Sequence, residues 1–305
     1  MSGYIAVCGG VNIDVGGRSA APLVAGDSNP GVIRTSLGGV GRNIAHDLAL
    51  LGAEVKLLTA LGGDEGAARI RTSCRTLGID LAFSLAVPEA ATSTYLYIDG
   101  PDGDMALAVN DMTIYERLTP DWFASALAVL NAAEAVVLDA NLPEASLTFI
   151  AERCTAPLLA DPVSAAKAPR LRRALGRLTA LKPNRLEAEA LTGIPVTDED
   201  SALAAADALL ATGLRRVFLT LGPDGVLAAE GTVRLRLRTP PRRPGDVCGC
   251  GDAFTAALAW AAVRGADLET AARMGLAAAA ITGECAGSVN PKLSAAELRT
   301  QMELI

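Results

Sequence analysis

The spacing of apolar residues changes repeatedly along the chain. Short apolar runs bounded by Gly, Pro or Asp are typical of buried strands, whereas apolar residues that recur every three or four positions are typical of helices. The two patterns alternate and predict an α/β fold, in which a mostly parallel sheet is flanked by helices on both faces. Ligands of such folds bind at the carboxyl ends of the strands. The strand-like runs are residues 4–10, 53–62, 133–140, 156–162, 177–183 and 214–222, and the helix-like segments are residues 38–52, 64–78, 142–154, 184–193 and 253–263.

Two segments, approximately residues 14–37 and 92–110, interrupt this alternation. They contain short β-like pieces such as "TSTYLYID", separated by Gly, Pro and Asp turns, with no helical pattern between them. They predict a small antiparallel sheet attached to an edge of the main sheet, which could act as a lid. We therefore expect one domain over residues 1–305, with the lid inserted in it.

Composition narrows the classes of function. The formal net charge is −7, which argues against an extended nucleic-acid surface or an anionic membrane as partner. No apolar run reaches the length of a membrane span, and no cationic segment precedes the first apolar run. The six cysteines lack the spacing of a zinc site. We expect a cytoplasmic protein with reduced cysteines and a small-molecule ligand.

The stretch "CGCGDAF", residues 248–254, precedes a helical pattern. Its glycines permit close approach of the backbone, and the amides of Gly249, Cys250 and Gly251 would converge at a helix N-terminus, which favours an anion. Asp252 stands beside them and could take a proton from an attacking hydroxyl group. A purely structural reading stays open, because Asp is common in the first turn of a helix.

Two further groups of residues occur where ligands are expected. Asn184 and Glu187 have the spacing of a reciprocal helix cap, and they could also orient water around a Mg²⁺ ion held by phosphate oxygens. Asn12 and Asp14 follow the first strand-like run and lie two residues apart, so they share one side of the chain. An ionised Asp accepts hydrogen bonds from both hydroxyls of a vicinal diol. Gly38 and Gly39 would let the backbone approach such a ligand, with Asn43 in the next helical turn, although turn chemistry explains these residues equally well.

The motifs "GGVNID", "GGVGRNIAHDLALLG", "LKPNRLEAEALTG", "TLGPDGV" and "GCGDAF" occur in the order and spacing of the ribokinase-like (PfkB) carbohydrate and nucleoside kinases. The resemblance covers nearly the whole chain and implies transfer of the γ-phosphoryl group of ATP to a hydroxyl group. The segments "DSNPG", "NDM" and "DPVSAAK" resemble members that act on the 5′-hydroxyl of a ribosyl C-nucleoside.

The resemblance also implies roles for individual residues. Asp252 corresponds to the catalytic base, and Gly249, Cys250 and Gly251 to the anion hole. Ribose contacts would come from Asn12, Asp14, Gly38, Gly39 and Asn43, and contacts above the base from Ser93, Thr94, Asn110 and Asp111. ATP would contact Asn184, Glu187, Thr220, Gly222, Gly225, Gly249 and Gly251, with Mg²⁺ bound through water to Asn184 and Glu187. A monovalent cation such as K⁺ would lie near Asp246, Ser288 and Asn290, and the lids of two chains would pair in a homodimer.

The chain departs from the family in one motif and leaves two alternatives open. Cys248 and Cys250 stand where the family usually has a hydroxyl residue and alanine; a backbone amide works with either side chain, but Cys248 lacks the hydroxyl. The acceptor could instead be ribose or another nucleoside. The chain could also be a nucleoside-binding regulator without activity, although Asp252 argues against this, since binding alone needs no base.

Overall fold

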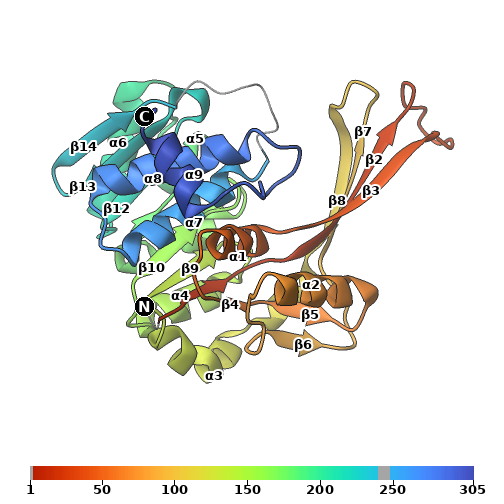
Figure 1. Cartoon of the computed structure of the whole chain (residues 1–305), viewed down its shortest axis with the longest axis horizontal. Helices are drawn as coiled ribbons and strands as arrows, with labels where there is room; N and C mark the ends of the chain where they lie inside the picture. Colours follow the sequence, from red (N-terminus) through yellow and green to blue (C-terminus); the bar gives the residue numbers. More distant parts are fainter. Residues whose placement is uncertain (1–2, 240–247) are drawn as a thin grey trace.

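The computed structural model describes residues 3–239 and 248–305 and is built around an eight-stranded sheet (Figure 1). Strands β4 to β12 of this sheet pair in parallel, whereas β12, β13 and β14 pair antiparallel at the other edge. The mostly parallel sheet that the apolar pattern predicts is confirmed. In spatial order the strands are β14 (Val233–Leu237), β13 (Val226–Glu230), β12 (Arg216–Thr220), β11 (Ala180–Leu181), β10 (Leu158–Asp161), β9 (Ala135–Asp139), β1 (Ile5–Cys8) and β4 (Val55–Leu58).

Helices cover both faces of the main sheet, as predicted. Side chains alternate across each strand, so Ile5 and Val7 of β1 enter one hydrophobic core while Ala6 and Cys8 enter the other. The core around Ile5 is covered by α1 (Val40–Leu50), α2 (Glu65–Thr76), α7 (Cys250–Ala262), α8 (Leu268–Thr282) and α9 (Ala295–Met302). The core around Ala6 is covered by α3 (Pro120–Asn131), α4 (Glu144–Arg153), α5 (Arg185–Thr192) and α6 (Glu199–Ala211). Short 3₁₀ helices are η1 (Thr113–Arg117), η2 (Ala168–Leu171), η3 (Leu175–Arg177) and η4 (Gly222–Asp224), and β5 (Ala60–Gly62) pairs with β6 (Leu85–Val87).

The lid is a separate four-stranded sheet that projects from the body (Figure 1). Its order is β3 (Gly31–Gly38), β2 (Asn12–Ser19), β7 (Thr94–Asp99) and β8 (Met105–Asp111). The predicted small lid sheet is confirmed, but it is separate from the main sheet and mixed instead of antiparallel, since β2 and β7 pair in parallel. Both strands run outward from the body and each returns through its own hairpin partner, so the two hairpins meet along their outgoing strands.

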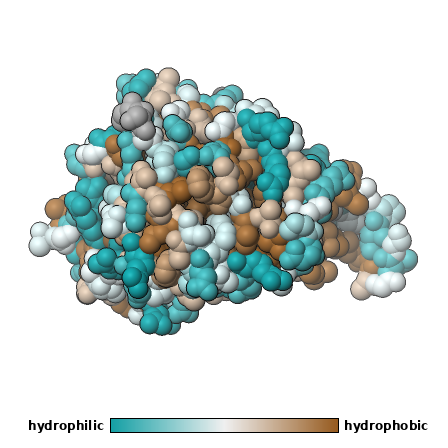
Figure 2. Space-filling model, turned by 90° about the horizontal axis from the view of Figure 1, so that it is seen from below, coloured by the Kyte–Doolittle hydropathy of each residue, from teal (hydrophilic) through white to brown (hydrophobic). Residues whose placement is uncertain are grey.

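Strand pairing gives the lid two different faces. One face carries Asn12, Asp14, Tyr95 and Asn110, since Asp14 pairs with Tyr95 and Tyr95 with Asn110. The opposite face is apolar, and hydrophobic side chains are visible on the projecting part of the molecule, at the right of Figure 2. We call this face the apolar lid face; its exposed members are Ile33, Leu96, Leu107 and Val109. In the described ranges, no helix combines the length and apolarity that crossing a membrane requires.

Candidate active site

Helix α7 begins at the glycine-rich motif. Its N-cap residue Gly249 has φ 77°, a left-handed conformation that favours glycine, and a Cβ atom there would collide with the backbone of Ser288. No side chain of the described residues caps this helix. A helix start of this kind favours a bound anion. Cys250 is partly exposed beside them.

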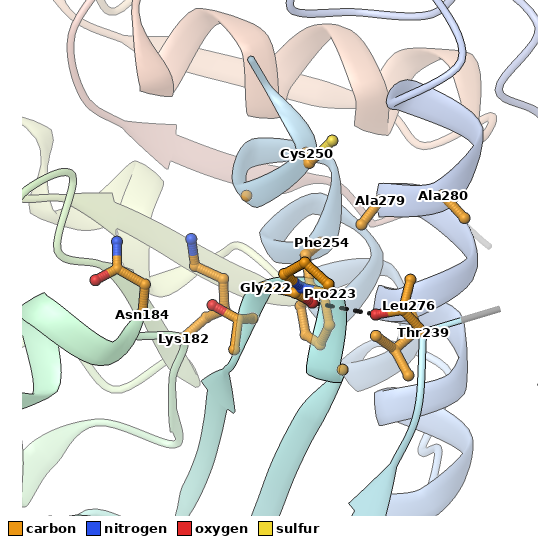
Figure 3. A pocket seen from close by; sticks show the side chains of 13 residues that line it. Lys182, Asn184, Gly222, Pro223, Thr239, Cys250, Phe254, Leu276, Ala279 and Ala280 are labelled. Carbon is orange, nitrogen blue, oxygen red and sulfur yellow. Dashed lines mark hydrogen bonds between the residues drawn. The ribbon is translucent and has the colours of Figure 1, made fainter. Parts of the chain in front are cut away.

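A cavity of about 540 Å³ lies in front of this helix start (Figure 3). Its polar end holds Lys182, Asn184 and Gly251, and its apolar wall includes Phe254 and Leu276. The other lining residues include Thr220, Gly222 and Gly225. Five of the seven residues predicted to contact ATP therefore line one cavity, whereas Glu187 and Gly249 are not among its lining residues. The cavity combines an apolar wall with polar groups, as small-molecule sites commonly do.

Asp252 lies in the first turn of α7 and faces helix α1. The Nδ2 atom of Asn43 donates a hydrogen bond to Oδ2 of Asp252 at 2.8 Å. Burial and the nearby Asp161 carboxylate raise the pKa of Asp252 to about 7, and the Asn43 hydrogen bond and the Lys182 ammonium oppose this rise in pKa. A carboxyl group whose pKa is near neutrality can accept a proton and release it again, as a general base must.

A buried ion pair that the sequence analysis missed lies beside Asp252. The Nζ atom of Lys182 is 2.9 Å from Oδ2 of Asp161, and their side chains are 7% and 3% exposed. The Thr255 hydroxyl donates to the same oxygen at 2.8 Å. Lys182 and Asp161 each stand at the carboxyl end of a strand, and this position was the signal that could have revealed them.

Asn184 and Glu187 form the reciprocal cap of α5. The Glu187 amide donates to Oδ1 of Asn184 at 2.9 Å, and the Asn184 amide donates to Oε2 of Glu187 at 2.8 Å. The structural alternative is therefore confirmed, and their contact with Mg²⁺ stays a prediction. Burial raises the pKa of Glu187 to about 6. Within the described ranges no three acidic, Cys or His side chains form a metal-binding group.

The predicted ribose contacts gather where the lid joins the body. Oδ1 of Asn12 accepts hydrogen bonds from the hydroxyls of Ser93 at 2.8 Å and Tyr115 at 3.0 Å. A Cβ atom on Gly38 would occupy the space of the Asp14 carboxylate. Burial raises the pKa of Asp14 to about 6, and the nearby Arg42 opposes this rise in pKa. Asp14 is therefore mostly ionised at neutral pH and can accept hydrogen bonds from a diol.

The backbone at Gly39 has φ 92°, a conformation that favours glycine, and a Cβ atom there would collide with the backbone of Gly10 and Val11. The residues predicted to contact the base separate between the faces of the lid. Asn110 shares the face of Asp14, whereas Thr94 and Asp111 pair with each other on the opposite face. Asp111 accepts hydrogen bonds from the Thr113 amide and hydroxyl.

The predicted monovalent-cation residues are placed only in part. Asp246 lies outside the described residues. The Ser288 hydroxyl donates to Oδ1 of Asn43 at 3.3 Å. The Asn290 amide group donates to the Ile281 carbonyl at 2.6 Å and accepts from the Lys292 amide at 3.0 Å, so it holds the loop after α8 together. The cation site stays a prediction.

Comparison with known proteins defines the class. Residues 2–295 match the family described as pfkB family carbohydrate kinase, and the protein belongs to this family. It is therefore an ATP-dependent kinase of a sugar or nucleoside, a class that uses ATP with Mg²⁺.

Individual relatives cover nearly the full chain. The pseudouridine kinase of Escherichia coli (strain K12) is 35% identical over 98% of this chain and 96% of its own length. The uncharacterized sugar kinase YeiI of the same organism is 33% identical over 96% of this chain and 81% of its own length. The ribokinase structure from Thermotoga maritima superposes with a TM-score of 0.89 and 23% identity, covering 99% of both chains. This last match shows the ribokinase-like fold.

Proposed function

We propose that the protein is a pseudouridine kinase, which transfers the γ-phosphoryl group of ATP to the 5′-hydroxyl of pseudouridine and gives pseudouridine 5′-phosphate. The observation that carries the kinase site is the hydrogen bond from Asn43 to Asp252. It joins the ribose side of the site, where α1 begins, to the phosphate side, where α7 begins. The choice of pseudouridine is supported by the 35% identical relative of that name and by the segments "DSNPG", "NDM" and "DPVSAAK".

The residues divide the work of the reaction between them. Asp14, on the polar face of the lid, accepts hydrogen bonds from the ribose hydroxyls and fixes the direction of the 5′-hydroxyl. Asp252 takes the proton of that hydroxyl as its oxygen attacks the γ-phosphorus. The amides of Cys250 and Gly251 stabilise charge on the transferring group. The lid excludes water, which would otherwise compete as the acceptor.

A panel of acceptors tests the assignment. Pseudouridine carries a base N–H that uridine lacks, and a buried acceptor left without its partner costs about 1–3 kcal/mol. We expect kcat/KM for pseudouridine to exceed that for uridine and for ribose by about tenfold or more. The measurement is ADP formation with Mg²⁺-ATP and each acceptor in turn.

Two outcomes of the panel would contradict the proposal in different ways. Equal or higher kcat/KM for ribose or another nucleoside would show that pseudouridine is not the preferred acceptor, while the proposed kinase reaction would stand. Failure to phosphorylate any panel member, by a folded protein that still binds nucleosides, would favour the non-catalytic regulator.

We also propose that two copies of the chain pair through the apolar lid face. This face carries exposed apolar side chains on a projecting sheet, and Ile33 is 75% exposed. A contiguous exposed patch of this kind is typical of an interaction surface. We expect the wild type to sediment as a dimer and Val109→Glu to sediment as a monomer, whereas Leu304→Glu, at an exposed leucine near the C-terminus, stays dimeric. A monomeric wild type would contradict this proposal.

A further inference from the structure

Lys182 places a positive charge at the start of helix α7. It follows β11 directly, and Figure 3 shows its amine and the Asn184 amide pointing the same way along the cavity. The Nζ atom lies 2.8 Å from the position that a Cβ atom on Gly251 would take. The ammonium therefore faces the same space as the amides of the predicted anion hole.

The surroundings of Lys182 keep it charged. Its Nζ atom is paired with the Asp161 carboxylate, and both side chains are almost fully buried, so the ammonium has an anionic partner where water is excluded. Among the described residues that line the cavity, Lys182 is the only one with a charged side chain. A bound triphosphate would add negative charge beside the carboxylates of Asp161, Glu187 and Asp252, and Lys182 is the positive charge that faces all of them.

The ion pair with Asp161 also fixes the position of the ammonium. Oδ2 of Asp161 receives both Lys182 and the Thr255 hydroxyl, and Oδ1 accepts the Val163 amide at 2.9 Å. Apart from Lys182, two hydrogen bonds therefore hold the Asp161 carboxylate in place. Donors fixed before the reaction stabilise a transition state without the cost of reorganisation.

We propose that Lys182 is a catalytic residue that contacts the transferring γ-phosphoryl group, and that Asp161 is its positioning residue. A bond forms between the acceptor oxygen and the γ-phosphorus, and the bond from that phosphorus to the β–γ bridging oxygen breaks. The electron pair of the broken bond stays on ADP, and the proton of the acceptor hydroxyl goes to Asp252. Lys182 keeps its proton throughout and neutralises the charge on the phosphoryl oxygens. This role depends on the kinase chemistry and not on which acceptor is used.

The variant Lys182→Met tests the proposal, because methionine fills similar space without charge. We expect kcat to fall about 10²- to 10³-fold, as when one preorganised donor to a transition state is lost. Affinity for ADP, measured by calorimetry, should change little, because ADP lacks the γ-phosphate. Lys56→Met is the matched control: Lys56 pairs with Asp80 at 2.6 Å at a more exposed position on β4, and its loss should leave kcat unchanged.

A double variant separates catalysis from folding. Removing Lys182 alone leaves Asp161 as a buried, unpaired charge, which is destabilising. Lys182→Met combined with Asp161→Asn removes both charges, so its melting temperature should exceed that of the single variant while its kcat remains low.

Recovery of kcat together with the melting temperature would overturn the proposal, since Lys182 would then only balance Asp161. A folded Lys182→Met enzyme with wild-type kcat would overturn it too. Should the single variant fail to fold, the double variant gives the same decision. The assays use whichever panel acceptor the wild type phosphorylates. If pseudouridine is not the acceptor, the wild type shows it, and this result is separate from the test of Lys182.

Discussion

Replacing Asp252 by Asn should lower kcat about 10²- to 10⁴-fold and leave nucleoside binding largely intact. Asn keeps the shape of the side chain, and its carboxamide oxygen can still accept the hydrogen bond from Asn43. It cannot accept the proton of the attacking hydroxyl. Steady-state kinetics with Mg²⁺-ATP, together with calorimetric titration of the nucleoside, measure the two effects separately.

The pH dependence gives a second reading of the same variant. Because the pKa of Asp252 is about 7, the fraction of ionised base grows as pH rises through 7. The wild-type kcat/KM should therefore rise over this range and lose that rise in Asp252→Asn. Asp267→Asn is a suitable control, since Asp267 caps the neighbouring helix α8 and Asn caps equally well. Near-wild-type kcat in Asp252→Asn would show that Asp252 is not the general base and only occupies the first turn of α7.

Gly249→Ala should abolish most of the activity, with a fall in kcat of at least about 10²-fold, comparable to the loss of an oxyanion-hole donor. Alanine is strained at φ 77°, and its Cβ atom would collide with the backbone of Ser288. The start of α7 must then shift, and the amides of the proposed anion hole shift with it. The measurement is kcat at a temperature where circular dichroism shows a folded protein.

Gly265→Ala is the matched control for this prediction. Gly265 has φ 68°, so alanine suffers the same kind of backbone strain, but nothing lies within 4 Å of its Cβ position. We expect a loss of stability of about 1–2 kcal/mol with wild-type kcat. If Gly249→Ala behaves in the same way as Gly265→Ala, the geometry at the start of α7 does not limit the reaction.

The sequence predicts the main sheet and the position of the site because both depend on local patterns. Apolar runs define the strands, and Asp14, Asn184 and Asp252 follow strand ends or begin helices, where a parallel sheet gathers its ligands. Pairing of β2 with β7 joins strands far apart in the chain, and no local pattern records their relative direction.

The buried ion pair was missed for a different reason. Lys and Asp are residue types that are mostly exposed. Only the folded chain shows that Lys182 and Asp161 are both buried and form an ion pair with each other. The two readings of Asn184 and Glu187 could not be separated either, because a cap and a water-mediated metal contact use the same atoms in compatible ways.

The short connection between lid and helix gives the fold a mechanical property. Strand β3 ends at Gly38 and α1 begins at Val40, so Gly39 alone separates the lid from the helix whose Asn43 side chain holds Asp252. If the lid moves about Gly39 when the acceptor binds, its motion would be transmitted directly to α1 and to the hydrogen bond between Asn43 and Asp252. Binding of the acceptor and alignment of Asp252 would then be coupled, and hydrolysis of ATP without a bound acceptor would be disfavoured.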